Sequence, residues 1–193
     1  MLKGLVAALL ALFVLLIPNS TMYASNNTQS TSYTYTFSIN GEIEISQDAY
    51  LPAALYLDLG LSDPQDLYIA GDRMYIADKG NKRILEVDLS DNSIRSIGEG
   101  VLNQPTGVSV DNNGRIYVAD YGNEEAYRFD KEGNLEFTFK KPATPNFGRN
   151  EGFKPVKITH ADDGGVYIVS EGTIAGIIHL NGTGDFLGYF ASN

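Results

Sequence analysis

The sequence predicts an all-β protein built mainly from a repeated unit of four short strands. Segments of similar pattern begin at Pro64, Pro105 and Pro155, which lie 41 and 50 positions apart. Each contains short apolar runs separated by Gly, Asn and Asp, the residues that favour tight turns. Beyond the first 25 residues, no stretch has a convincing helical apolar period over more than two turns. A strand-only repeat of this length is typical of the blades of a β-propeller.

The composition limits the classes of function. The 193 residues include 24 Asp and Glu, 14 Lys and Arg, two His and no Cys, with a formal net charge of -10. The lack of Cys excludes a disulfide scaffold, a cysteine zinc site and a thiol nucleophile. Two His leave little for a His-rich metal site or a Ser-His-Asp triad. The acidic balance argues against a nucleic-acid partner, which favours a basic face.

Residues 1–25 have the three-part layout of a secretory signal peptide. Lys3 precedes 13 apolar residues from Leu5 to Ile17, and small residues end the segment. Such a run is short for a bilayer span, which needs about 20 residues. Met22 occupies a place where cleavage favours a small residue, so an uncleaved membrane anchor stays open. We expect a secreted or extracytoplasmic (cell-surface) protein that contacts a membrane only if this segment is retained.

Residues 26–63 are predicted to form a polar spacer and a β-hairpin. Residues 26–31 carry little that packs, and residues 33–39 then alternate strictly between aromatic or aliphatic and polar side chains. Asn40 and Gly41 separate this run from a second alternating run. Because both residues tolerate positive φ, we expect a type I′ turn at this dipeptide.

The second strand of each repeat is predicted to be buried on both faces. These strands read as continuous apolar runs at 74–77, 116–119 and 166–169. Such runs fit a sheet that lies between two neighbouring sheets. We expect three four-stranded blades, with repeats at 64–104, 105–152 and 153–193.

The repeat resembles the NHL repeat over roughly residues 64–190. The similarity rests on a Pro-x-(Gly/Asp)-(Val/Leu) start, a Tyr-(Val/Ile)-Ala-Asp strand and a following Gly-Asn. The polar residues that match the family pattern are Asp78, Asn81 and Arg83 in the first repeat, and Asp120 and Asn123 in the second. The third repeat has Ser170, Thr173 and Ala175 at these places. We interpret this set as structural, joining blade to blade by hydrogen bonds.

The resemblance implies a ring of six blades, about twice the number present here. A blade buries its faces by stacking on neighbours, so the two end blades of an arc would expose apolar surface. Three explanations stay open. The chain is part of a longer one, two copies associate through their open blade faces, or residues 26–63 cap a smaller β-domain.

The resemblance also implies an enzyme as an alternative function, because secreted propellers of this kind include calcium-dependent lactonases and zinc-dependent lyases. Their active sites lie along the central channel. Asp66, Thr106 and Lys157 are the residues that we expect near this axis. Asp66 is a suitable oxygen ligand, whereas Thr106 is a poor one and a lysine repels a cation. His160 and His179 lack a metal-binding spacing and are interpreted as ordinary strand residues. No catalytic or cofactor-binding residue is predicted.

We therefore expect a binding or scaffold module for a protein or glycan, and we favour this role over an enzyme. The candidate contact residues are Asp66, Tyr121, Phe147 and Phe153. The alternative is a lactonase-like or lyase-like metal-dependent enzyme whose site is completed by further blades. Calcium is implied only under that alternative.

Overall fold

The computed structural model describes residues 34–46, 56 and 58–190. The predicted signal peptide at residues 1–25 lies outside this range. Among the described residues, no helix combines the length and apolar character needed to cross a membrane. The chain divides into two compact units, Met1–Leu59 and Gly60–Asn193, which are described separately below.

The first unit contains the predicted hairpin. Its strands β1 (Thr34–Phe37) and β2 (Ile43–Ser46) pair antiparallel, with Phe37 opposite Ile43. The amide of Gly41 donates to the carbonyl of Ser38, and Gly41 alone in this loop has a positive φ, of 79°. The predicted type I′ turn is therefore wrong. A three-residue loop ending in a left-handed glycine replaces it, because Asn40 keeps a negative φ.

The second unit consists of three four-stranded antiparallel sheets, each with its strands in sequence order. Sheet 1 contains β3 (Pro64–Ala70), β4 (Arg73–Asp78), β5 (Arg83–Asp88) and β6 (Ile94–Ile97). Sheet 2 contains β7 (Pro105–Val110), β8 (Ile116–Asp120), β9 (Glu125–Phe129) and β10 (Leu135–Phe139). Sheet 3 contains β11 (Lys154–His160), β12 (Val166–Glu171), β13 (Ile177–Leu180) and β14 (Phe186–Phe190).

Helix is confined to two single turns in the described part of the chain, the 3₁₀ turns Lys79–Asn81 and Pro145–Phe147. Turns between strands use glycines with positive φ, such as Gly114 at 82° and Gly184 at 84°. Only glycine adopts this conformation without a steric cost, so these turns are encoded locally. The all-β, propeller-type prediction with three four-stranded blades is confirmed.

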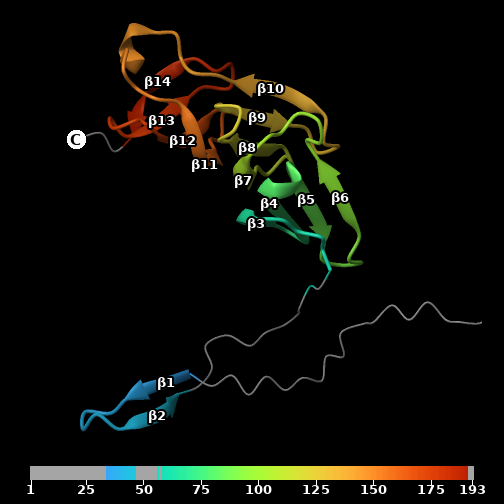
Figure 1. Cartoon of the computed structure of the whole chain (residues 1–193), viewed down its shortest axis with the longest axis vertical. Helices are drawn as coiled ribbons and strands as arrows, with labels where there is room; N and C mark the ends of the chain where they lie inside the picture. The colour runs from blue at the N-terminus through green and yellow to red at the C-terminus, as the bar shows by residue number, and fades with distance from the viewer. Residues whose placement is uncertain (1–33, 47–55, 57, 191–193) are drawn as a thin grey trace, which may run out of the picture. The chain divides into compact units, whose positions relative to one another are not determined.

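The three sheets stack side by side with their first strands innermost (Figure 1). Strand β7 lies between β3 and β11, and the last strands β6, β10 and β14 lie on the outside. Sheet 2 is buried on both faces. Ile116 and Val118 of β8 join the core shared with sheet 1, whereas Tyr117 and Ala119 join the core shared with sheet 3. This alternation explains why β8 reads as a continuous apolar run.

Candidate functional site

The polar residues of the first repeat fix the segment that enters sheet 1. Asp78 is fully buried at the end of β4, and its carboxylate accepts hydrogen bonds from Ser62 N at 2.7 Å, Asn81 Nδ2 at 2.7 Å and Arg83 Nε at 2.9 Å. The Asn81 amide also donates to the carbonyl of Gly60 at 2.7 Å. The set therefore holds the chain before β3 against the turn after β4.

The environment of Asp78 favours its ionised form. Burial opposes ionisation of this carboxyl, but the hydrogen bonds from Ser62, Asn81 and Arg83 outweigh burial and lower the pKa of Asp78 below its usual value. Asp78 thus remains charged at neutral pH although it is shielded from water. Its partners are the residues that make this possible.

Asp120 plays the same part in sheet 2 with backbone donors alone. Its buried carboxylate accepts from the amides of Asn103 at 2.7 Å and Gln104 at 2.9 Å, which precede β7. It also accepts from the amides of Gly122 and Asn123 in the following turn. Asn123 Nδ2 donates to the carbonyl of Val101 at 3.0 Å, as Asn81 does to that of Gly60.

In sheet 3, two side-chain hydroxyl groups hold the segment that enters the sheet. Ser170 Oγ accepts from the amide of Lys154 at 2.7 Å, and Thr173 Oγ1 donates to the carbonyl of Gly152 at 2.6 Å. In all three repeats these residues bind the segment that enters their own sheet. This local arrangement differs from the direct blade-to-blade bonding that we expected.

The residues expected near the axis do come together, on the first strands of the three sheets. Lys157 Nζ lies 2.8 Å from Asp66 Oδ1 and also donates to the carbonyl of Gln65 at 3.3 Å. The other oxygen of Asp66 accepts from the amide of Val108 in β7 at 3.0 Å. One carboxylate therefore joins sheet 1 to both other sheets. In addition, the hydroxyl Oγ1 of Thr106 donates a hydrogen bond to the carbonyl of Pro155 at 3.2 Å.

Gly107 occupies the corresponding position in sheet 2. Asp66 pairs with Ala77, Gly107 with Ala119 and Lys157 with Val169, so these three residues are equivalent. A Cβ on Gly107 would lie 2.9 Å from the carbonyl oxygen of Val156 and 3.0 Å from Lys157 Cα. The missing side chain lets β7 and β11 approach closely. Thr106, which we expected near the axis, therefore lies one residue before the position that is equivalent to Asp66 and Lys157.

These axial residues do not fit a divalent cation. Asp66 supplies the carboxylate that a cation would need, but the ammonium of Lys157 already contacts it. A positive charge at this distance disfavours binding of a metal ion. No group of three or more His, Asp or Glu side chains in the described part of the chain is arranged to hold a metal ion.

Phe147 and Phe153 are core residues. They are 1% and 3% exposed, and Phe147 packs edge-on against Phe186 with ring centroids 5.4 Å apart. The chain between sheets 2 and 3 folds back over sheet 3, and this buries both rings. Neither ring is available to a ligand, which corrects the expectation that they belong to an open contact surface.

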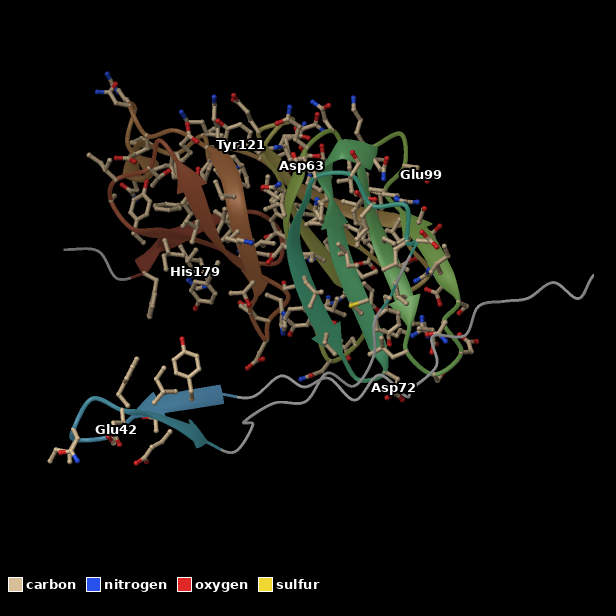
Figure 2. All side chains as sticks on the ribbon, turned by 60° about the horizontal axis from the view of Figure 1, so that its bottom comes forward. Glu42, Asp63, Asp72, Glu99, Tyr121 and His179 are labelled. Atoms are coloured by element: carbon tan, nitrogen blue, oxygen red, sulfur yellow. The ribbon has the colours of Figure 1, made fainter. Side chains whose placement is uncertain are left out.

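Tyr121 is half-buried and is the first residue of the loop that joins β8 to β9. The ammonium of Lys154 lies 5.5 Å from the centre of its ring and 3.6 Å from Glu124 Oε1. Figure 2 shows Tyr121 and Asp63 at the same end of the sheets, away from Asp72. Lys79 pairs with Asp63 at 2.9 Å at this end. We call this end, formed by residues 79–82, 121–124 and 172–176, the loop end.

Ile174 is the most exposed apolar side chain of the loop end. It is 93% exposed, yet its backbone is held, because its amide donates to Glu151 Oε2 at 2.9 Å. The neighbouring Thr173 is fixed to Gly152. Ile174 was not predicted as a contact residue, since a single apolar residue in a loop carries no sequence pattern. Only its exposure in the fold distinguishes it.

Two charged groups, one buried and one partly buried, were also missed. Glu86 is 3% exposed and lies between the guanidinium groups of Arg73 and Arg95. Arg128 of β9 reaches sheet 3, where it donates to the carbonyls of Gly164 at 3.1 Å and Gly182 at 3.2 Å. Both lie at alternating strand positions that read as ordinary surface residues, so sequence pattern gave no signal for them.

The comparisons with known proteins agree with this architecture. The family model of the NHL repeat matches residues 102–124. The structure is similar to hydrazine synthase of Kuenenia stuttgartiensis, with a TM-score of 0.55 and 16% identity, over 74% of this chain and 40% of that one. It is also similar to a catalytically inactive virginiamycin B lyase of Staphylococcus aureus with quinupristin, with a TM-score of 0.50 and 17% identity, over 80% of this chain and 47% of that one.

A third similar structure is a protein of unknown function from Bacteroides caccae, with a TM-score of 0.50 and 11% identity, over 65% of this chain and 48% of that one. No curated protein sequence matches the chain. The chain thus spans less than half the length of the solved structures above. At these identities the likeness is one of fold. Residues 102–124 match the NHL repeat, and the architecture is of the β-propeller type.

Proposed function

We propose that this NHL-repeat, propeller-type chain is a non-catalytic binding module that presents its loop end to a protein ligand outside the cell membrane. The observation that carries the proposal is Ile174, which is 93% exposed on a loop fixed by hydrogen bonds. A rigid, exposed aliphatic side chain costs little entropy when it enters a pocket on a partner. Binding residues are commonly presented in this way by loops on a stable sheet scaffold.

The chemistry of the loop end favours a protein over a glycan. Glycan recognition uses open aromatic faces, but the ring of Tyr121 is faced by the ammonium of Lys154. Glu124 and Lys154, which pair with each other beside Tyr121, supply charged groups at the loop end and would form part of a polar rim. A partner with an apolar pocket and charged edges would be complementary to this surface.

The axial residues support binding over catalysis. Asp66 is engaged by Lys157 and by the amide of Val108, so its role is to join sheets. The calcium-dependent, lactonase-like alternative requires this carboxylate to be released or supplemented by other ligands. A thermal midpoint that does not respond to EDTA or to added calcium supports the binding module. A midpoint that rises clearly with calcium supports the enzyme.

Export is part of the proposal and rests on the apolar run from Leu5 to Ile17. We expect the protein in the extracytoplasmic fraction of its source cells, with residues 1–25 removed. Fractionation followed by mass spectrometry of the N-terminus tests this. Retention of the full chain in the membrane fraction would support the anchor instead, and a cytosolic full-length chain would overturn export.

The ligand is tested with two matched variants. Ile174→Asp places a charge on the loop end, and Ile94→Asp does so at the opposite end of sheet 1, where Ile94 is 56% exposed. Immobilised parent and variants are exposed to extracytoplasmic proteins and, separately, to cell-wall polysaccharide. A protein retained by the parent and Ile94→Asp but lost with Ile174→Asp supports the proposal, once the purified pair gives a measurable Kd. Equal retention by all three, or binding of polysaccharide alone, contradicts it.

A further inference from the structure

Sheet 3 has one face that no other described sheet covers. Ile158, Ile168 and Ile178 point into the core shared with sheet 2, so the residues that alternate with them point away. We call the opposite surface the outer face of sheet 3. It is formed by Lys157, Thr159, Tyr167, Val169, Ile177, His179 and Phe190.

The outer face of sheet 3 is apolar and aromatic at its centre. Tyr167 and His179 are cross-strand neighbours whose rings stack 4.2 Å apart at 11°. Phe190 meets Tyr167 edge-on at 5.9 Å. Phe190 is 62% exposed and Val169 is 47% exposed. Large apolar side chains gathered on a flat sheet face indicate a contact surface rather than a solvated one.

The same positions form the interfaces between the other sheets. Tyr117 and Ala119 of sheet 2 correspond in register to Tyr167 and Val169, and both are completely buried against sheet 3. His160 of sheet 3 stacks on Tyr117 with ring centroids 5.8 Å apart. The outer face of sheet 3 therefore continues an interface that the molecule already uses. A sheet surface is the occupant that fits it.

Charge also marks this face as an interface. The chain carries 24 acidic residues, yet the charged side chains on this surface are confined to its margins. Lys157 lies at the axial edge, where it is paired with Asp66, and Glu171 lies at the end of β12. Depletion of charge from the centre, with charged residues at the rim, is the pattern of protein interfaces. An uncharged centre also lets two identical surfaces meet without repulsion.

The opposite end of the stack is not equivalent. The residues of β4 and β5 that point away from sheet 2 are already buried, with Ile76 at 4% and both Leu85 and Val87 at 0% exposure. The exposed apolar residues there lie on the first and last strands, at Leu67, Ile69 and Ile94, and not on the central strands. A head-to-tail contact would need both ends to be open over their central strands. The outer face of sheet 3 is thus best matched by itself.

We propose that the outer face of sheet 3 is the interface of a symmetric dimer, in which a second copy of this chain packs the same face against it. A two-fold axis near Tyr167 brings the two aromatic clusters together and buries Val169 and Phe190 of both copies. Isologous pairing of this kind is the commonest form of homo-oligomer. The proposal is independent of the ligand at the loop end, which belongs to other residues.

The test compares two substitutions of similarly exposed aliphatic residues. Val169→Asp places a charge at the centre of the proposed interface, and Leu67→Asp places one on β3, where the side chain is 54% exposed. The purified protein and both variants are measured by size-exclusion chromatography with light scattering over a range of concentrations. Circular dichroism establishes that each variant keeps its β-structure.

We expect the parent and Leu67→Asp to have twice the mass of the 21.0 kDa chain, corrected for any cleaved signal. Val169→Asp should be monomeric, with a dimer Kd at least about tenfold higher, since one buried charge costs more than 1.4 kcal/mol. A parent that is monomeric at every concentration overturns the proposal. Dissociation by Leu67→Asp with Val169→Asp still dimeric also overturns it, and points to an interface at sheet 1.

Discussion

The ammonium of Lys157 in β11 lies 2.8 Å from the carboxylate of Asp66 in β3, so the first and third sheets are joined directly at the inner edge of the stack. The strand between them, β7, carries Gly107 at the equivalent position. Asp66 is also the acceptor for the amide of Val108 in β7. This relationship gives the axial residues a structural role and leads to the first two predictions.

Removing the ion pair should lower the free energy of unfolding modestly. The effects of substituting its two members should not be additive. Both side chains are partly exposed, so we expect Asp66→Asn and Lys157→Met to show a coupling energy of about 0.5–1 kcal/mol in a double-mutant cycle. Asp66→Ala should cost more, about 1–3 kcal/mol, because Val108 N–H loses its acceptor. Urea unfolding of the four proteins of the cycle and of Asp66→Ala measures these values. Strict additivity would show that the pair does not contribute.

Adding one methyl group at Gly107 should be costly. The new Cβ would lie 2.9 Å from the Val156 carbonyl oxygen, and backbone cannot move aside as a flexible side chain does. We expect Gly107→Ala to lower the free energy of unfolding by about 1–3 kcal/mol. Gln65→Ala, at an exposed position of the same edge, serves as the control and should change stability by less than about 0.5 kcal/mol. Equal effects would contradict the close approach of β7 and β11.

Asp78 should give the protein a pH-dependent stability. The pKa of Asp78 is lower in the folded state than in the unfolded state, where it is 3.8. The contribution of its carboxylate to the free energy of unfolding is therefore complete above pH 3.8, and it is lost as the pH falls through the lower pKa of the folded state. We expect Asp78→Asn to cost about 3 kcal/mol near neutral pH, because Arg83 and Ser62 lose a charged acceptor. The difference from the parent should shrink in acid. The exposed Asp72→Asn is the control, and a difference independent of pH would refute the assignment.

Tyr117 should make the protein sensitive to alkali. Burial and the neighbouring Asp111 raise the pKa of its hydroxyl from 10.0 to about 12, and the hydroxyl donates to Asp111 Oδ2 at 3.2 Å. The neutral form is favoured in the folded state, so this contribution is complete below pH 10.0 and is lost as the pH rises toward about 12. Tyr117→Phe should lose about 1 kcal/mol at neutral pH and show a flatter alkaline stability curve. Phenolate absorbance during titration provides the direct measurement, and one fewer late-titrating group is expected in the variant.

The fold class was predictable because its signals are local. Alternating side chains and glycines with positive φ specify strands and turns within a few residues, and the repetition of Pro64, Pro105 and Pro155 marks the three sheets. The hairpin was also recognised from alternation. Its loop was mispredicted because the choice between a two-residue and a three-residue loop depends on the φ of Asn40, which the dipeptide does not fix.

The candidate site was less predictable because it depends on contacts between sheets. Phe147 and Phe153 read as surface aromatics in a Gly- and Pro-rich loop, but the path of that loop over sheet 3 buries them. Ile174 gave no pattern, and its prominence comes from the loop that holds it. Asp66 and Lys157 were both expected on first strands near the axis, yet their ion pair was not foreseen, because it depends on how close two strands 91 residues apart in the sequence lie.

By itself, the sequence determined the strands, the turns and the division into three similar sheets, since each follows from steric and hydrophobic preferences of neighbouring residues. Only the tertiary structure decided which equivalent positions are buried. Tyr117 and Tyr167 stand at the same place in their strands, but the first lies under a neighbouring sheet and the second does not. The physical reason is that a sheet face is sheltered from water by another sheet, and that shelter is a property of the stack rather than of any one repeat.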